Sequence, residues 1–420
     1  MTVSKMMQLR SKYCSCWLSL AFAILFLVTY FWRNLTTLTY GKLRLQRSCL
    51  LKTNLSGFQV EDLIRDLEEI YDFEREECLM VHSVIKQIYE LELGSSRSLK
   101  YDEEFKLKIK QWLGPIIARD EEAFKKQVVT TVYNKWTRSM TSRNPLRGKK
   151  PRKSTSSSIN FTTIDDQNHC DFCQGKYAKD IFLSNQHAIA AANSFKLQDF
   201  NALFIFQQHN PLKLTYEDYA GMFKLANQWF ELAAKSSRYG HDHPIMSWDS
   251  LPPSGGSQIH AHMHGFLGRG HQLGRFRGYQ DARLLYSQDH SKSDFTQDLI
   301  NIHVALGLAI RLDSITIVSP LDPISNHELW IFSPKVDDSF AETVNLVHRT
   351  YVDELQVMSW SSGISWPNDG DLAKLVIGAR SDNYPVSSME LFLFSSVISN
   401  PYETLDAVKR TLIRIKQTKD

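Results

Sequence analysis

Three histidines alternate with apolar residues in one short segment of the chain, His260-Ala261-His262-Met263-His264. In a β-strand alternate side chains share a face, so this segment would present three imidazoles on one side and Ala261 and Met263 on the other. An imidazole is both a nucleophile and a leaving group near neutral pH. Histidine clusters are also frequent metal sites, so the pattern by itself leaves catalysis and metal binding open.

A glycine-containing loop, Ser254-Gly255-Gly256-Ser257, comes directly before the histidines. Glycine permits backbone conformations that bring N–H groups close to an anion. The loop therefore favours an anionic ligand beside the three imidazoles.

One CxxC, Cys170 and Cys173, is the only cysteine pair whose spacing suggests chemistry. Six cysteines in 420 residues do not form the framework of a small disulfide-rich protein. The pair could bind a metal ion, remain as two free thiols, or form a disulfide in an oxidising compartment.

The elements that must position these residues form a repeat. Two apolar strands at 189–192 and 202–206 precede an amphipathic helix at 216–234, and a similar series follows at a constant offset of 126 residues. The second series has strands at 315–318 and 328–332 and a helix at 340–355, and an apolar strand at 391–397 falls where its histidine segment would lie. We therefore expect an α+β fold in which two related halves share an antiparallel sheet flanked by helices.

The amino-terminal part differs in character. Residues 13–32 carry no charge and have aromatic residues at both ends, which predicts a transmembrane signal-anchor, with a cleaved signal peptide as the alternative. Positive charges flank both sides of this segment and do not decide its orientation. The sequons at Asn34, Asn54 and Asn160 favour a glycoprotein with a lumenal body in the ER or Golgi, whereas acylation of Cys14 and Cys16 would suit a cytosolic body.

Composition supports this organisation, since 43% hydrophobic and 23% charged residues are typical of globular proteins. A net charge of +3 gives no indication of nucleic acid as a partner. The predicted order is a tail at 1–12, the anchor at 13–32, a stem at 33–57, a helical region at 58–137, a basic and Ser-rich linker or insertion at 138–158, a first half at 159–290 and a degenerate second half at 291–420.

Residues 255–266, Gly-Gly-Ser-Gln-Ile-His-Ala-His-Met-His-Gly-Phe, resemble the motif of the histidine-triad superfamily, in which three histidines alternate with apolar residues. The doubled fold is similar to the galactose-1-phosphate uridylyltransferase and dinucleotide phosphorylase branch. The resemblance extends from about residue 160 to 416. It implies that His262 attacks the α-phosphorus of a nucleotide to form a covalent nucleotidyl-imidazole, and that His264 stabilises the charge that develops on phosphorus.

The resemblance also implies a nucleotide-binding set and a structural zinc ion. The phosphate and nucleotide ligands would be Gly255, Gly256, Ser257, Gln258 and Asn193. The zinc ligands would be Cys170, Cys173, His209 and His260, with His169, His187, His241 and His243 as nearby competitors. In the second half, Lys335 matches His209 at the offset of 126, and we expect that half to be a scaffold.

Two positions depart from the family. The uridylyltransferases have glutamine at the third histidine position, where this chain has His264. The family usually has asparagine eleven residues before the first histidine, where this chain has Asp249, a carboxylate that would repel phosphate unless it is paired. Arg269, Arg275 and Arg277 could offset that charge, or form a solvated basic loop.

We therefore expect a nucleotidyltransferase or phosphorylase that acts on a nucleoside-diphosphate sugar or a dinucleotide. Its partners would be that substrate, a phosphate or sugar phosphate acceptor, the membrane through residues 13–32, and a second copy in a homodimer. A hydrolase of the same superfamily is the nearest alternative, and a catalytically idle nucleotide-binding or scaffold module is the other.

Overall fold

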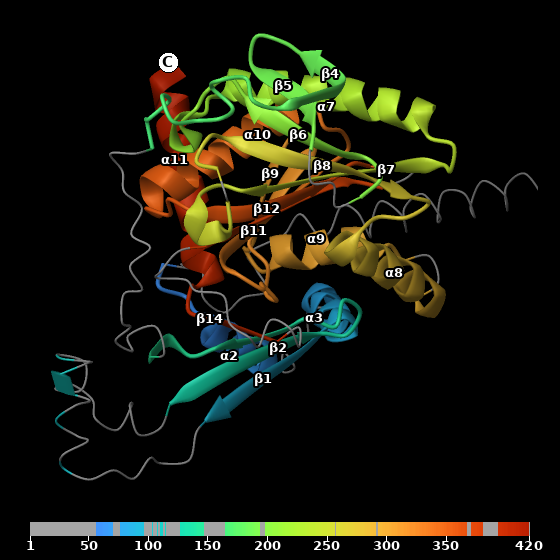
Figure 1. Cartoon of the computed structure of the whole chain (residues 1–420). Coiled ribbons are helices and arrows are strands. Elements are labelled where there is room, and N and C mark those ends of the chain that lie inside the picture. The colour runs from blue at the N-terminus through green and yellow to red at the C-terminus, as the bar shows by residue number, and fades with distance from the viewer. Residues whose placement is uncertain are drawn as a thin grey trace, which may run out of the picture.

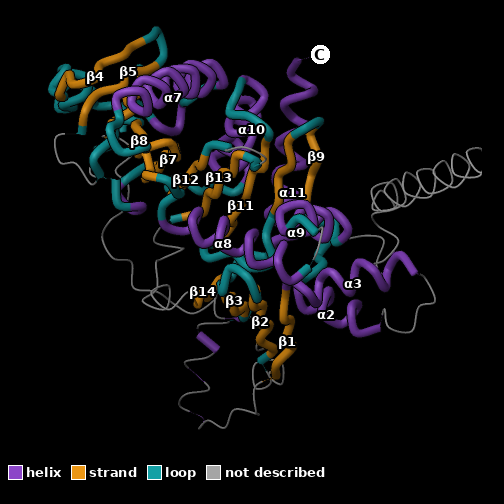
Figure 2. Tube along the Cα trace, turned by 90° about the vertical axis from the view of Figure 1, so that its right-hand side faces the viewer, coloured by secondary structure: helices purple, strands orange, loops and turns teal. Residues whose placement is uncertain are grey.

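The computed structural model describes residues 56–69, 76–95, 127–146, 164–193, 198–256, 258–290, 293–367, 371–380 and 394–419, with single residues at 103, 107, 110, 111 and 114. A large antiparallel sheet and a small mixed sheet form its framework, with helices on both faces of the larger one (Figures 1 and 2). The predicted tail and stem lie outside the described residues except for Ser56 and Gly57, as do residues 13–32, the three sequons, Cys14 and Cys16.

The large sheet has ten strands in the order β4-β5-β6-β8-β7-β12-β13-β11-β10-β9. The first five strands of that order are β4 (Ala178–Ser184), β5 (Ala188–Ala192), β6 (Asn201–Phe206), β8 (His262–Arg269) and β7 (His241–Asp249). The other five are β12 (Trp360–Ser365), β13 (Ala373–Ala379), β11 (Asn326–Ser333), β10 (Ile315–Val318) and β9 (Ala309–Leu312). Each strand of the second group corresponds to one of the first, from β7 and β12 at the centre to β4 and β9 at the two edges, so the second group has the order of the first reversed. The two halves meet where β7 pairs with β12.

One face of the sheet is covered by α7 (Tyr216–Ser236), α10 (Asp338–Arg349), the π-helical turn η5 (Thr350–Glu354) and α11 (Pro401–Lys419). α7 begins with a capping box, in which Thr215 and Asp218 satisfy each other's backbone N–H groups. Its buried residues recur at three- and four-residue spacing, from Tyr219 and Met222 to Phe230 and Ala233, and form one core with the strands beneath.

Among the described residues, helices cover the opposite face only along the second half. There α8 (Gly274–Asp289) and α9 (Phe295–Ala305) lie between the large sheet and the small one, as both views show (Figures 1 and 2). A second core joins this face to the amino-terminal residues. It includes Trp330 and Phe332 of β11 together with Phe58, Ile85 and Tyr89.

The amino-terminal residues form α2 (Val60–Glu69), α3 (Glu76–Ile88) and a four-stranded sheet in the order β1-β2-β3-β14. Its strands are β1 (Tyr89–Ser95), β2 (Val128–Asn134), β3 (Met140–Arg143) and β14 (Phe394–Val397). The small sheet is fastened to the second half by Asp322, a buried carboxylate that accepts hydrogen bonds from Tyr89 Oη (3.0 Å), Asn134 Nδ2 (3.1 Å) and Ser139 Oγ (2.5 Å).

The fold prediction requires three corrections. No helix of the described part of the chain is both long and apolar enough to cross a membrane, so the transmembrane helix in the predicted fold and the single-pass membrane localisation are wrong on this finding. Residues 58–137, expected to be helical, also contribute β1 and β2, and β3 lies inside the stretch 138–158 expected as a linker. The strand expected at 391–397 is β14, which pairs in parallel with β3 in the small sheet and does not join the large one.

The offset between the two halves is 127 residues, one more than the sequence comparison indicated. Ala190 pairs with Phe204 in the first hairpin, and Ile317 pairs with Ile331 in the second. All four side chains lie in the helix-covered core. An offset of 126 would match Phe204 with Trp330, which belongs to the core on the other face. A slip of one residue exchanges the two faces of a strand, so every face assignment carried across the repeat depends on this correction.

Candidate active site and metal site

The three histidines lie at the start of β8, between β6 and β7. His262 is opposite Ile205 and His264 is opposite Leu203. Ala261 and Met263 are buried in the core beneath α7, so the histidines occupy the other face, as their alternation predicts.

His262 is buried, and its tautomer follows from its hydrogen bond. Nδ1 lies 2.7 Å from the carbonyl oxygen of His260, and because a carbonyl only accepts, Nδ1 carries the proton. Nε2 therefore keeps its lone pair. Burial lowers the pKa of His262 to about 4, an effect that the neighbouring His264 reinforces. The ring is thus neutral and nucleophilic through Nε2 at neutral pH.

His264 lies next to His262, with ring centroids 5.4 Å apart, and is less buried. Asn193 Nδ2 is 3.5 Å from His264 Nδ1 and donates a shorter hydrogen bond (3.0 Å) to Asn201 Oδ1. The pKa of His264 is lowered, chiefly by burial, while the charge of Asp249 acts in the opposite direction. The structure therefore places Asn193 beside His264 on the histidine face.

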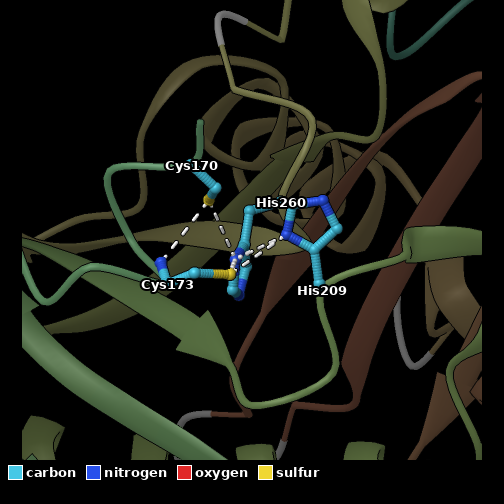
Figure 3. Close-up of side chains that lie close together, drawn as sticks. All are labelled: Cys170, Cys173, His209 and His260. Atoms are coloured by element: carbon cyan, nitrogen blue, oxygen red, sulfur yellow. Dashed lines mark hydrogen bonds between the residues drawn. The ribbon is translucent and has the colours of Figure 1, made fainter. Parts of the chain in front are cut away.

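Cys170, Cys173, His209 and His260 converge on one point (Figure 3). Each contributes one ligand atom, and the four atoms all lie within 4.8 Å of one another. Nδ1 of His260 is 3.3 Å from both sulfur atoms and 3.2 Å from Nδ1 of His209. Ligands that share a tetrahedral zinc ion at roughly 2.0–2.3 Å would be about 3.3–3.8 Å apart, so the observed separations are close to those of a zinc site.

The chemistry of these four residues also fits a metal ion. Both histidines turn Nδ1 towards the sulfur atoms, while His260 Nε2 donates to the carbonyl oxygen of Phe206 at 2.7 Å. This outer hydrogen bond fixes the ring with Nδ1 free for a metal. Desolvation and the neighbouring Cys170 raise the pKa of Cys173 to about 11, and a cation between the two sulfur atoms would oppose that shift. The four residues could therefore hold a metal ion.

The structure does not support a disulfide within the CxxC or a metal site at the nearby histidines. Cys170 and Cys173 are both free thiols, whereas Cys78 is disulfide-bonded. No other metal-ligand cluster occurs in the parts of the chain that the structure describes. The exposed His169 is paired with Asp166 instead (2.8 Å).

The glycine turn has a different arrangement from the one expected. The N–H of Gly255 donates to Pro252 O (2.9 Å) and that of Gly256 donates to Leu251 O (3.3 Å), so both amides are used within the turn in this conformation. Glycine is needed here sterically, because a Cβ on Gly256 would lie 2.8 Å from Asp249 O. Ser257 lies outside the described residues, and Gln258 is partly buried in the segment that leads to His260.

Asp249 lies on the histidine face. Ser247 pairs with His264, and Asp249 follows two residues later on β7. Its carboxylate is exposed and accepts a hydrogen bond from Ser361 Oγ (2.7 Å), which comes from the second half. The arginines considered as its partners are engaged elsewhere: the guanidinium of Arg269 stacks on Tyr239 and Arg275 pairs with Glu328. Arg277 lies 4.0 Å from Asp281.

Sequence reasoning missed Phe172, Asn201 and Ser361. Phe172 could have been noticed because it lies between the two cysteines, and Asn201 because it begins β6 opposite Asn193 in the hairpin. Ser361 comes from the other half of the sheet, and its position had no signal in the sequence.

Solved structures show which fold the chain shares. An ADP-glucose phosphorylase from Arabidopsis thaliana matches with a TM-score of 0.52 and 12% identity, over 67% of this chain and 98% of that one. A GalT-like protein from the same plant matches at 0.47 and 13%, over 58% of this chain and 92% of that one. A uridylyltransferase matches at 0.46 and 12%, over 55% and 86%. No protein-family model matches the chain, and no curated protein matches it significantly. The chain therefore has the fold of the ADP-glucose phosphorylase.

Proposed function

We propose that the chain is a nucleotidyltransferase or phosphorylase that acts on a nucleoside-diphosphate sugar or a dinucleotide through a covalent nucleotidyl-His262 intermediate. The observation that carries the proposal is the fixed tautomer of His262, whose Nδ1 donates to His260 O and whose Nε2 keeps its lone pair. A phosphorus nucleophile needs such a neutral, oriented imidazole. The shared fold with an ADP-glucose phosphorylase is consistent with this reaction.

In the proposed first step, the lone pair of His262 Nε2 forms a bond to the α-phosphorus while the bond from phosphorus to the bridging oxygen breaks. The leaving sugar phosphate or nucleotide takes that electron pair. In the second step an oxygen of inorganic phosphate or of a sugar phosphate attacks the same phosphorus, and the P–N bond breaks to restore the imidazole. His264, next to His262, donates a hydrogen bond to the charge that develops on the phosphoryl oxygens.

Zinc is the metal that the Cys2His2 set fits best, and its role in the proposal is structural. When bound, it supplies a fixed crosslink between the CxxC loop and the strand ends that carry His209 and His260. His260 then serves as a ligand, and its carbonyl oxygen orients His262. The two neighbouring histidines thus have separate tasks.

The test is covalent labelling of the full chain with nucleoside-diphosphate sugars and dinucleotides that carry a radioactive α-phosphate. Wild type should retain an acid-labile, base-stable label, and His262→Gly should retain none. His169→Ala is the matched control, because it removes an exposed histidine near the metal ligands and should label normally. A folded, zinc-loaded wild type that takes up no label from any donor would refute the proposal and favour the idle binding module.

The same labelled protein separates the enzyme classes. Release of the label by phosphate indicates a phosphorylase, release by a hexose phosphate indicates a transferase, and equally fast release in water alone indicates the hydrolase. His264 is the residue that favours the hydrolase, because the uridylyltransferases have glutamine at that position.

A further inference from the structure

Phe172 lies inside the CxxC, between the two cysteines that converge with His209 and His260. Its ring makes edge contacts with two of the three histidines. The ring centroids are 5.7 Å apart for His260, with an interplanar angle of 80°, and 5.2 Å apart for His262, with an angle of 71°. Such T-shaped pairs are a preferred geometry for aromatic rings. One phenyl ring therefore contacts both a metal ligand and the proposed nucleophile.

The backbone of Phe172 is held by local hydrogen bonds of the CxxC loop. Its carbonyl oxygen accepts from the N–H of Gly175 (3.1 Å), and the Cys170 carbonyl accepts from Gln174 (3.1 Å). Gly175 has a φ of +70°, a conformation that glycine adopts without strain and that closes this turn. The N–H of Cys173 also points to Cys170 Sγ (3.5 Å). The loop that carries the ring thus includes one contact to a sulfur atom that would bind the metal.

His262 is buried, so its ring is held by packing as well as by hydrogen bonding. Within the described residues its ring makes one hydrogen bond, from Nδ1 to His260 O. One hydrogen bond at one edge of an imidazole does not set the orientation of the ring by itself, so the packing against it contributes. Phe172 and His264 are the aromatic rings that contact it.

We propose that Phe172 is a positioning residue, through which the metal-bound CxxC loop holds the His262 ring in the orientation that directs Nε2 at phosphorus. This inference rests on the proposed function for its effect on rate. The contact between Phe172 and His262, and its dependence on metal, are independent of any reaction. Phe172 acts through His262 and has no assigned contact with the substrate.

The test compares Phe172→Ala and the conservative Phe172→Leu with Phe182→Ala, an exposed aromatic residue of β4 that stacks on Tyr177 away from the histidines. All three variants should keep the zinc content of wild type, because no metal ligand is changed. In single-turnover labelling, Phe172→Ala should lower the maximal rate about 10- to 100-fold, the range expected for a misplaced reacting group. The donor concentration that gives half the maximal rate should change less than about threefold. The maximal rate of Phe172→Leu should lie between those of wild type and Phe172→Ala. The maximal rate of Phe182→Ala should equal that of wild type.

A second measurement needs no activity. The Cε1–H resonance of His262, assigned by its absence in His262→Gln, should carry a ring-current shift from Phe172. Phe172→Ala should remove that shift, and removal of zinc by a chelator should remove it in wild type but leave Phe172→Ala nearly unchanged.

Three results would overturn the inference. An unchanged resonance in Phe172→Ala would mean that the rings are not in contact. A resonance insensitive to zinc would mean that the metal does not hold Phe172. A loss confined to donor affinity, with the maximal rate preserved, would make Phe172 a binding platform for the substrate. If no donor labels wild type, the proposed function fails, and the resonance experiments still decide whether zinc positions His262 through Phe172.

Discussion

Gly265 lies in the histidine strand immediately after His264, where the strand packs against the core beneath α7. A Cβ built on this glycine would be 2.3 Å from Phe204 Cε2 and 3.0 Å from Phe204 Cδ2. Carbon atoms in contact are about 3.5–4.0 Å apart, so Gly265→Ala requires a relative displacement of roughly 1 Å between the two groups. Phe204 is fully buried between Trp229 and Phe230, at 5.7 Å and 5.9 Å between ring centroids, and has no open space to enter.

The expected effect is the sum of two opposing contributions. Overpacking of a tight core costs about 1–3 kcal/mol. Replacing glycine with alanine inside a strand recovers about 0.5–1 kcal/mol, because glycine loses more backbone entropy on folding. Gly265→Ala should therefore lower the free energy of unfolding by up to about 2.5 kcal/mol, with a central value of about 1 kcal/mol. It should also slow the labelling of His262, because the strand that carries the histidines must shift.

The assay is urea unfolding of wild type, Gly265→Ala, Phe204→Leu and the double variant. A smaller side chain at 204 makes room for the new methyl group, so the double variant should be more stable than the two single effects predict, by about 1 kcal/mol. Gly278→Ala in α8 is the matched control, since a Cβ there meets nothing within 4 Å and helix propensity should make it slightly stabilising. Equal stabilities for Gly265→Ala and Gly278→Ala, or an interaction energy near zero, would refute the steric argument.

Three further predictions concern the metal, the departure from the family, and acid stability. Cys173→Ser should lower the zinc content well below that of wild type and reduce the thermal midpoint, as measured by metal analysis and calorimetry, because it removes one of four converging ligands. Asp249→Asn should tighten donor binding about threefold to tenfold in a titration, since it removes an exposed carboxylate from the face where phosphate would bind; weaker binding would mean that the carboxylate does not oppose phosphate. His348 is buried, and neither of its ring nitrogens has a hydrogen-bond partner among the described residues. Burial lowers its pKa to about 3, so the unfolded state binds the proton more readily than the folded state. The free energy of unfolding should therefore fall as the pH drops below about 6.5. His348→Leu should reduce that fall by up to about 1.4 kcal/mol per pH unit in urea unfolding at pH 7, 6 and 5.

Local patterns predicted the parts of the site that are local in sequence. The alternation at residues 260–264 gave the face of each histidine, because the period of a strand is two residues wherever it is placed. The CxxC and His209 could be assigned through the resemblance, and the structure brings these three residues and His260 to one point. The strands at 189–192 and 202–206 and the helix after them were also predictable, from apolar runs and from the amphipathic pattern of the helix.

Sequence patterns could not predict which backbone groups of the turn are already bonded, or which distant strands pair. The glycine turn looked like an anion site, but its two amides are used by Leu251 and Pro252, and only the turn geometry reveals this. The apolar strand at residues 391–397 looked like part of the second half, yet β14 pairs with β3, more than 240 residues earlier in the chain. Strand partners across such a separation leave no local periodicity, since an apolar run is compatible with either sheet.

The corrected offset of 127 residues explains why the described part of the chain contains one histidine site and not two. Ile205, opposite His262, corresponds to Phe332, and Phe332 pairs with Lys374. Lys374 therefore occupies in the second half the position of the proposed nucleophile. Its ammonium group lies over the rings of Tyr279 and Trp330, at 3.8 Å and 3.9 Å from the ring centroids.

The surroundings of Lys374 prevent nucleotide chemistry at that position. Its flanking counterparts on the same face are Leu372 and Val376, which supply neither a metal ligand nor a hydrogen-bond donor for phosphate. The face is also covered by α9 and by the amino-terminal core around Phe58 and Tyr89, whereas the matching face of the first half carries the exposed Asp249 and the partly buried His264. A phosphate ester could therefore approach the histidine face of the first half but not Lys374. The second half instead supplies strand partners and Ser361, which donates a hydrogen bond to Asp249, so in the proposed function it completes the frame of the first half.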